Sequence, residues 1–331
     1  MESYFQDKKV CLYRADISDV LDFFDENYFD AVFTDPPYGL GFKGHKWDEN
    51  IPSQEIWEKA LRAAKPGSHM LAFGAPRTYH RLSVYVEDAG WNIKDSLLWL
   101  HGGGFTKSNY ISNNLQGEEA EEWKDYANLL KPAFEPILLC QKPLDGKYVD
   151  NVRKWGVGCL NIGGCRIGGR WPPNVLMDEE SANMLDAQSG ITKSNPNPYK
   201  ERREDNSALQ YSTGRVTNYT DTGGASRFFY VPRVSTKEKT CNRTIKNNHP
   251  TTKPVVLTKY LANLLLPPKR ELGKRVIFIP YLGSGSEVIG CLESGWDKIV
   301  GVEKDAGYCS IAAKRIRYYQ EDKRPEIFDG G

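Results

Sequence analysis

The chain has 331 residues, of which 40% are hydrophobic and 26% are charged, and a formal net charge of +1. These values are ordinary for a globular protein, and no run of about 18 apolar residues indicates a membrane span. The start of the chain is polar and lacks the apolar core of a signal peptide, and the seven scattered cysteines include no Cys-x-x-Cys pair. We therefore expect a cytoplasmic protein with reduced cysteines, no membrane partner and no metal site.

The first part of the chain, residues 9–145, alternates short apolar runs with helical patterns. Such alternation is typical of an α/β fold with a mostly parallel sheet that helices cover on both faces. The expected elements are strands at Lys9–Tyr13, Asp30–Thr34, His69–Phe73, Trp91–Leu100 and Ala133–Gln141, and helices at Ile17–Phe24, Ser53–Ala64 and Arg77–Ala89.

The strand Asp30–Thr34 is followed directly by Asp35, Pro36, Pro37 and Tyr38. Prolines fix φ and remove backbone N–H donors, so neither a ladder nor a helix can continue there. The carboxyl edge of the sheet, where ligands bind in open α/β folds, therefore receives a carboxylate, bare carbonyls and an aromatic ring. This set suits the exocyclic –NH2 of a flat nucleobase. The alternative is a Pro-rich strand exit with a buried tyrosine.

The middle of the chain, residues 145–248, is rich in Gly, Asn, Ser and Pro and has one brief helical pattern at Asp178–Gln188. Long irregular inserts of this kind are usually functional or disordered. This region holds 16 Lys and Arg against 11 Asp and Glu, and aromatic residues are interleaved with the basic ones. We therefore place nucleic-acid contact here. A mildly basic, solvated insert is the alternative interpretation.

From residue 249 the alternation of strands and helices resumes. The expected elements are a helix at Thr251–Leu266, a strand at Arg275–Ile279, a helix at Ser286–Ser294, a strand at Lys298–Val302 and a helix at Gly307–Tyr319.

A glycine-rich turn joins two of these elements, and it contains Gly283, Ser284 and Gly285. Glycines let the backbone approach a ligand closely. Glu303 follows about 20 residues later, which is the spacing that ribose recognition needs. Because the third glycine of a full dinucleotide fingerprint is absent, the pattern favours a nucleoside without a pyrophosphate, such as S-adenosylmethionine.

The segment Asp35–Tyr38 resembles the Asp-Pro-Pro-Tyr motif of amino-DNA methyltransferases, which methylate N6 of adenine or N4 of cytosine. Because this motif precedes the cofactor turn, the order resembles the circularly permuted β class. The resemblance runs from about residue 9 to 319 and implies a Rossmann-like class I methyltransferase with a mostly parallel seven-stranded sheet. It divides the chain into a catalytic half (1–144), a target-recognition region (145–248) and a cofactor half (249–331).

Residue roles follow from this resemblance. Asp35 and the Pro36 carbonyl would hold the target amino group, with Pro37 and Tyr38 completing the motif and the Tyr ring stacking on a base flipped out of the duplex. The segment His249–Pro254 is similar to a His-Pro-Thr-x-Lys-Pro motif beside the methionine part of the cofactor. The implied cofactor-binding residues are Asp16, Asp35, Thr251, Lys253, Tyr281, Gly283, Ser284, Gly285, Ser286 and Glu303.

One departure from the family pattern concerns the cofactor turn, where the family commonly has Asp-Pro-Phe-x-Gly-Ser-Gly-Thr. Here Ile279 stands in place of the Asp and Tyr281 in place of the Phe. The missing carboxylate normally supports the glycine turn and the amino-acid end of the cofactor, so its loss would weaken cofactor binding unless other groups compensate.

Double-stranded DNA is the partner that the resemblance implies. A loop from Gly39 to Asp48 resembles a flap that closes on DNA. The candidate contacts to phosphates or guanines are Lys43, Lys46, Arg166, Arg170, Arg202, Arg203, Arg215 and Arg227.

The resemblance favours adenine over cytosine, since many N4-cytosine enzymes have Ser where this chain has Asp35. An N4-cytosine methyltransferase, a DNA-binding protein on a decayed methyltransferase fold, and methylation of RNA or protein glutamine are the alternatives. The family implies a bacterial or phage restriction–modification setting, a cytoplasmic location with the nucleoid DNA, and the option of a homodimer.

Overall fold

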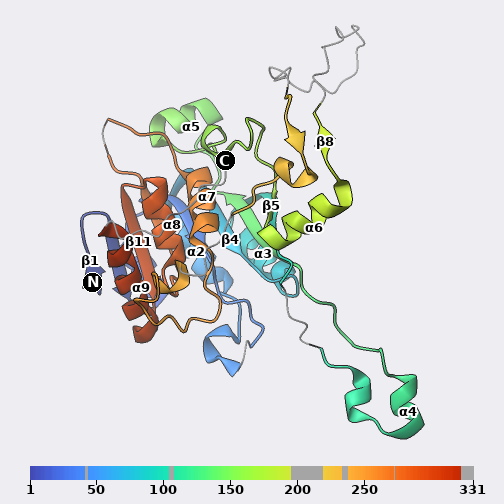
Figure 1. Cartoon of the computed structure of the whole chain (residues 1–331). Coiled ribbons are helices and arrows are strands. Elements are labelled where there is room, and N and C mark those ends of the chain that lie inside the picture. The colour runs from blue at the N-terminus through green and yellow to red at the C-terminus, as the bar shows by residue number, and fades with distance from the viewer. Residues whose placement is uncertain (42–43, 104–107, 195–218, 233–237, 272, 322–331) are drawn as a thin grey trace.

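The computed structural model describes residues 1–41, 44–103, 108–194, 219–232, 238–271 and 273–321. Its centre is a nine-stranded sheet with helices on both faces (Figure 1). The strands of this sheet are β1 (Phe5–Gln6), β2 (Val10–Arg14), β3 (Phe29–Thr34), β4 (Ala64–Phe73), β5 (Asn92–Leu100), β6 (Phe134–Gln141), β7 (Val175–Met177), β10 (Val276–Ile279) and β11 (Lys298–Glu303). The α-helices are α1 (Ile17–Phe23), α2 (Gln54–Ala63), α3 (Tyr79–Asp88), α4 (Gly117–Glu122), α5 (Tyr148–Trp155), α6 (Glu179–Ser189), α7 (Val255–Leu265), α8 (Ser286–Ser294) and α9 (Ala306–Gln320).

The strand order in the sheet is β1-β2-β11-β10-β3-β4-β6-β5-β7. Strands β2, β11, β10, β3 and β4 are parallel, and β6 pairs antiparallel with both β4 and β5. The predicted α/β fold with a mostly parallel sheet is confirmed. The seven expected strands form the middle of the sheet, and β1 and β7 extend its edges. Strands β10 and β11 from the end of the chain lie between β2 and β3 from its start. The two halves of the chain therefore build one continuous sheet.

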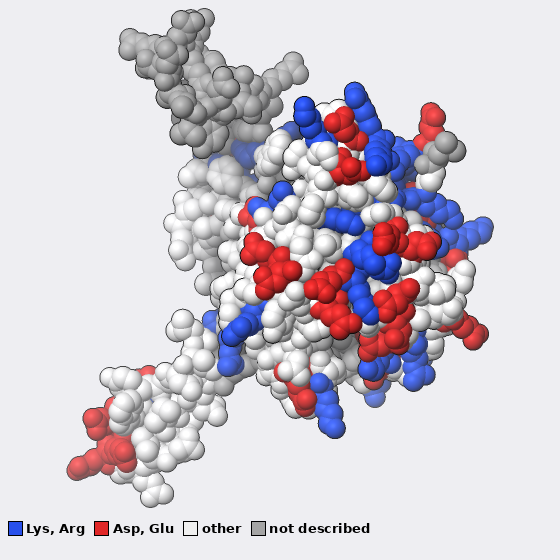
Figure 2. All heavy atoms as spheres, turned by 180° about the vertical axis from the view of Figure 1, so that it is seen from behind, with Lys and Arg blue, Asp and Glu red and all other residues white. Residues whose placement is uncertain are grey.

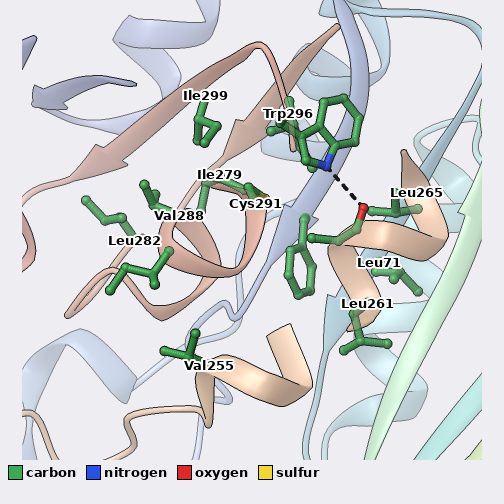
Figure 3. Close-up of a cluster of buried hydrophobic side chains, with 14 of the residues drawn as sticks. Leu71, Val255, Leu261, Leu265, Ile279, Leu282, Val288, Cys291, Trp296 and Ile299 are labelled. Carbon is green, nitrogen blue, oxygen red and sulfur yellow. Dashed lines mark hydrogen bonds between the residues drawn. The ribbon is translucent and has the colours of Figure 1, made fainter. Parts of the chain in front are cut away.

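Two apolar clusters hold the helices against the sheet. Helices α1, α2 and α3 contribute to the cluster on one face, and α7, α8 and α9 to the cluster on the other. Figure 3 shows part of the second cluster, where the Trp296 indole donates a hydrogen bond to the Ala262 carbonyl at 3.1 Å. Ile279, at the end of β10, is fully buried in this cluster. The strand end that carries an acid in the resembled family is therefore apolar here.

Two element boundaries differ from the sequence-based expectation. Strand β4 begins at Ala64, ahead of the predicted start at His69, and therefore includes Pro66. The pairing of β3 with β4 jumps from Ala64 to His69, so the missing N–H of Pro66 costs no ladder bond. Helix α7 begins at Val255, four residues later than expected, because a residue before proline disfavours helical backbone and Pro254 precedes the helix.

The middle region does not stand apart from the sheet. Its strand β7 pairs parallel with β5, and its helix α5 packs on β4. A separate small sheet joins β8 (Thr192–Lys193) and β9 (Thr222–Gly223). Neither α5 nor β7 was expected from the sequence.

Between β5 and β6 the chain leaves the body as an arm that holds α4 (Figure 1). Figure 2 shows acidic side chains at the tip of this arm, whereas basic and acidic side chains are interspersed over the visible face of the body. None of the helices in the described part of the chain is long and apolar enough to cross a membrane. The acidic residues in and beside α4 are Glu118, Glu119, Glu121, Glu122 and Asp125.

Candidate active site

A cavity of about 380 Å³ lies at the carboxyl ends of β3, β10 and β11. The Thr34 hydroxyl donates to the Pro280 carbonyl at 3.0 Å, which ties the end of β3 to the end of β10. The two motifs that stand about 245 residues apart in the chain therefore line one cavity. The lining residues are Asp35, Pro36, Pro37, Tyr38, Leu40, Trp47, Asp48, His249, Thr251, Thr252, Lys253, Tyr281, Leu282, Gly283, Ser284, Ser286, Glu287, Glu303, Lys304, Asp305 and Tyr308.

A four-residue network forms the catalytic-motif side of the cavity. The Lys253 ammonium lies 2.9 Å from Asp35 Oδ2 and 2.9 Å from Glu135 Oε2, and it donates to the Tyr38 hydroxyl at 3.0 Å. The Tyr38 hydroxyl in turn lies 2.7 Å from Asp35 Oδ1 and 3.0 Å from Glu135 Oε2. This arrangement fixes the Asp35 carboxylate at the wall of the cavity, and each carboxylate oxygen can accept more than one hydrogen bond.

Burial and the neighbouring charges shift the pKa values of three groups in this network. Burial by itself lowers the pKa of Lys253, but the Asp35 and Glu135 charges outweigh it and hold that pKa above its ordinary value. Burial raises the pKa of the Asp35 carboxyl, and the Lys253 charge opposes this shift. Burial and the two carboxylate charges raise the pKa of Tyr38, so its hydroxyl stays protonated.

Asp48 braces the turn that follows the motif. Its carboxylate accepts hydrogen bonds from the backbone N–H groups of Tyr38 at 2.6 Å, Gly39 at 3.2 Å and Leu40 at 3.3 Å. Asp48 belongs to a short 3-10 helix, Lys46–Asp48, at the end of the predicted flap, and it is buried. The loop end is therefore anchored on the cavity rather than detached from it.

The cofactor-turn side of the cavity is built around Glu303 at the end of β11. Its carboxylate accepts hydrogen bonds from the N–H groups of Gly283 and Asp305, both at 2.8 Å, and burial raises its pKa. Gly283 has φ +52°, and a Cβ there would lie 2.9 Å from His249 Nε2, so the turn requires glycine. Because burial and the nearby Lys253 charge lower the pKa of His249 to about 4, its ring is neutral near pH 7.

A second acid, Glu287, lines the same side of the cavity from the first turn of α8. It is 4% exposed. Burial and the Asp35 charge raise the pKa of its carboxyl to about 7. No hydrogen bond or ion pair joins this carboxylate to any other side chain within the described residues.

The structure brings most of the predicted cofactor-binding residues to this cavity. Two do not line it. Asp16 instead accepts a hydrogen bond from the Ser18 N–H at 3.0 Å as the N-cap of α1, and Lys304 lies 3.2 Å from it. Gly285 has φ +84° and packs toward Ala312 of α9. It therefore belongs to the glycine turn but does not line the cavity.

The predicted DNA contacts have diverse surroundings. Lys43, Arg202, Arg203 and Arg215 lie outside the described residues. Arg170 binds Asp221 through both terminal nitrogens at 2.6 and 2.9 Å, and its guanidinium lies 4.0 Å from the Tyr219 ring centre. Arg227 donates to the carbonyls of Gly223 and Gly224, each at 2.7 Å. Both arginines thus hold the insert together. Arg166 is exposed, donates to the Gly169 carbonyl at 2.9 Å and lies 5.8 Å from the Trp171 ring centre.

Sequence reasoning missed Glu135 and Glu287 as site residues. Glu135 stands near the start of β6, which runs antiparallel to β4 and therefore begins at the edge where the parallel strands end. Glu287 follows the glycine turn directly. Trp47, His249 and Tyr308 also line the cavity, with the His249 and Tyr308 rings 4.5 Å apart.

Known proteins resemble this chain along most of its length. A family model described as DNA methylase, for the N6 and N4 enzymes, matches residues 29–314. The Type II methyltransferase M.HindIII of Haemophilus influenzae is 23% identical over 369 residues, covering 95% of this chain and 99% of that protein. The structure of the PvuII DNA methyltransferase (cytosine-N4-specific) aligns with a TM-score of 0.55 and 13% identity, covering 97% of this chain and 94% of that one.

Proposed function

The chain belongs to the N6/N4 DNA methylase family, and on that premise we propose that it methylates N6 of adenine in double-stranded DNA. The observation that carries this proposal is the Asp35 carboxylate, which the Lys253 ammonium and the Tyr38 hydroxyl hold at the cavity wall. It stands at the head of a motif whose second residue, Pro36, offers a backbone carbonyl beside it.

The cofactor is S-adenosylmethionine, which supplies a methyl group on a sulfonium when it is bound. The cavity fits a nucleoside of this kind. Its volume of about 380 Å³ lies within the usual range for small-molecule sites. At Gly283 any side chain would meet His249, and Glu303 offers a carboxylate to vicinal ribose hydroxyls. The residues that would hold the cofactor are Thr251, Tyr281, Gly283, Ser284, Ser286 and Glu303.

Asp35 and the Pro36 carbonyl would act on the target amino group. The lone pair of an aromatic amine is delocalised into the ring, so the nitrogen is a poor nucleophile. Accepting hydrogen bonds from both N–H groups favours a more tetrahedral nitrogen with a localised lone pair. By fixing the orientation of that nitrogen, Asp35 and the Pro36 carbonyl would provide much of the rate gain through proximity and orientation. No covalent enzyme intermediate is required.

Lys253 and Tyr38 would serve Asp35 rather than the cofactor. Lys253 is 5% exposed and already lies between two carboxylates, so we assign it to positioning instead of the cofactor contact that the family motif implies. The Tyr38 ring would stack on the base once it leaves the duplex. Flipping costs a few kcal/mol, which stacking and hydrogen bonds in the cavity offset.

Adenine is proposed over cytosine because the motif begins with Asp35. The likeness to the cytosine-N4-specific PvuII enzyme concerns the fold alone, at 13% identity. The likeness to a Type II methyltransferase is compatible with a modification enzyme that works on bacterial or phage DNA in the cytoplasm.

Nucleoside mass spectrometry tests this proposal. The purified protein is incubated with isotope-labelled S-adenosylmethionine and DNA that lacks methylation, and the DNA is digested to nucleosides. Labelled N6-methyladenine is the expected product, and it should be absent with Asp35→Ala. Labelled N4-methylcytosine would overturn the base assignment while leaving the family chemistry in place.

A further inference from the structure

The cofactor turn of this chain lacks the acid that the resembled family carries at the end of the preceding strand. Ile279 occupies that position, is fully buried, and belongs to the apolar cluster between the sheet and α7 to α9. No carboxylate can therefore reach the cavity from residue 279. The amino-acid part of S-adenosylmethionine carries an ammonium group, which needs an acceptor of opposite charge once it is taken out of water.

Glu287 provides a carboxylate on the same wall. It follows the glycine turn in the first turn of α8, lines the cavity and is 4% exposed. Its carboxylate accepts a hydrogen bond from its own backbone N–H, but it makes no ion pair and no hydrogen bond with another residue in the described part of the chain. A buried carboxyl without a charged partner is costly. Although an acid is favoured in the first turn of a helix, that effect does not require it to face a cavity.

The charged groups around Glu287 leave it available to a ligand. Lys253 is engaged by Asp35 and Glu135, and Lys304 pairs with Asp16. Arg315, on α9, donates to the Ser284 carbonyl at 2.7 Å and to the Ser286 hydroxyl at 3.2 Å. The Asp35 charge raises the pKa of Glu287, and the Lys253 and Arg315 charges lower it. Neither of these two cations forms an ion pair with Glu287 in the described part of the chain, so its carboxylate can take a cationic group of a ligand.

We infer that Glu287 is the binding site for the ammonium group of the amino-acid part of the cofactor, and that it replaces the acid missing at residue 279. The inference rests on the proposed function, because it takes S-adenosylmethionine as the ligand of the cavity. In the resembled family the acid stands at the end of the strand before the glycine turn. In this chain the corresponding carboxylate would come from Glu287, in the first turn of the helix after the turn.

Calorimetric titration of the full chain tests the inference without any methyl transfer. The ligands are S-adenosylhomocysteine and its deaminated counterpart, which has a hydrogen in place of the ammonium group. A hydrogen bond to a charged group contributes about 1.5–3 kcal/mol, so wild type should bind S-adenosylhomocysteine about tenfold to hundredfold more tightly than the deaminated ligand. Glu287→Gln should lose that factor for S-adenosylhomocysteine and bind the deaminated ligand as wild type does.

Two further variants make the result specific. Glu303→Gln, in the same cavity, should weaken both ligands by the same factor, because its proposed contact is to the ribose. Ile279→Asp combined with Glu287→Gln should restore part of the preference for the ammonium group, provided that circular dichroism shows a folded protein.

The possible outcomes distinguish a wrong role for Glu287 from a wrong cofactor. If Glu287→Gln binds S-adenosylhomocysteine as tightly as wild type, or weakens both ligands equally, the inference is wrong while the proposed function stands. If wild type binds neither ligand, the cofactor assignment itself fails and the inference fails with it.

Discussion

The two sides of the cavity differ in how their buried charges are satisfied. On the β3 side, Asp35 and Glu135 share the Lys253 ammonium and the Tyr38 hydroxyl, so every charged group has a partner at 2.7–3.0 Å. On the α8 side, Glu287 is as deeply buried as Lys253 but has no such partner within the described residues.

The two sides therefore suit two different ligands, the target amino group on the β3 side and the charged part of the cofactor on the α8 side. A network that is complete before the substrate arrives holds its groups in place and needs little reorganisation at the moment of reaction. It suits a neutral amino group that only donates hydrogen bonds. A buried acid without a partner is instead completed by the ligand, so it suits a charged part of the cofactor. The predictions below break each side in turn.

The largest effect is expected at the complete network. Asp35→Ala removes the acceptor that would localise the amino lone pair, so methyl transfer should fall by about 10²–10³-fold. Affinity for S-adenosylhomocysteine should stay within a few fold. Rapid-quench measurements and calorimetry on the same preparation separate these two quantities. A variant that keeps near-normal turnover would remove Asp35 from its assigned role.

Breaking the network through its cation should destabilise the fold. Lys253→Met leaves two partly buried carboxylates without their shared partner, at an expected cost of about 3 kcal/mol in the free energy of unfolding. Urea denaturation at pH 7 measures it. Adding Glu135→Gln to Lys253→Met should recover part of that loss. Equal stability of Lys253→Met and wild type would show that the network contributes nothing.

The Glu287 carboxyl should make the ligand-free protein less stable as the pH rises. Its pKa is about 7 in the folded state, above the ordinary value of about 4.3 in an unfolded chain. The folded state therefore binds more protons between these values, and stability falls as the pH rises through this window. In wild type this effect lowers the free energy of unfolding by on the order of 2 kcal/mol between pH 5 and pH 8, and Glu287→Gln should abolish it. Urea denaturation at pH 5 and pH 8 tests it, and an unchanged pH slope would contradict the account.

Two substitutions of Tyr38 separate its ring from its hydroxyl. Tyr38→Ala should weaken binding of DNA with a flipped-out base by about 1–2 kcal/mol, since it removes the stacking face. Tyr38→Phe keeps the ring and should leave DNA affinity unchanged but slow methyl transfer, because Asp35 loses a hydrogen bond. Fluorescence of 2-aminopurine at the target position reports the stacking. The same fluorescence for wild type and Tyr38→Ala would argue against it.

The smallest effect is expected for two arginines of the middle region, one with an acidic partner and one exposed to solvent. Arg170 already has its partner in Asp221, whereas Arg166 is exposed. Arg166→Ala should reduce the slope of log affinity against log salt by about 0.9, the value for one phosphate contact. Arg170→Lys should leave that slope unchanged, because the charge at this position is paired with Asp221 and not with a phosphate. A reduced slope for Arg170→Lys would show that Arg170 contacts DNA.

Most of the sheet could be predicted because seven of its strands read as apolar runs between turn residues, whereas the two-residue strand β1 could not. Strand β7 has only three residues and helix α5 is mostly polar, so neither has a clear local pattern. They take their places through pairing with β5 and packing on β4. Likewise the start of β4 at Ala64 depends on a register jump opposite β3, which no local pattern records.

The site was predictable where its chemistry stands at strand ends. Asp35 and Glu303 each follow or end an apolar run, and parallel strands bring such ends to one edge. Glu135 required knowledge that β6 is antiparallel, which places the beginning of that strand at the same edge. Glu287 was missed because an acid in the first turn of a helix is favourable for the helix alone. Only its burial and missing partner distinguish it.

The most direct measurement is a crystal structure of the full chain with S-adenosylhomocysteine. The account predicts that the ligand ammonium lies within about 3.2 Å of a Glu287 oxygen, while Asp35, Glu135, Tyr38 and Lys253 keep the contacts described above. An ammonium group placed elsewhere, with Glu287 still unpaired, would contradict the contrast between a side that is complete and a side that the cofactor completes.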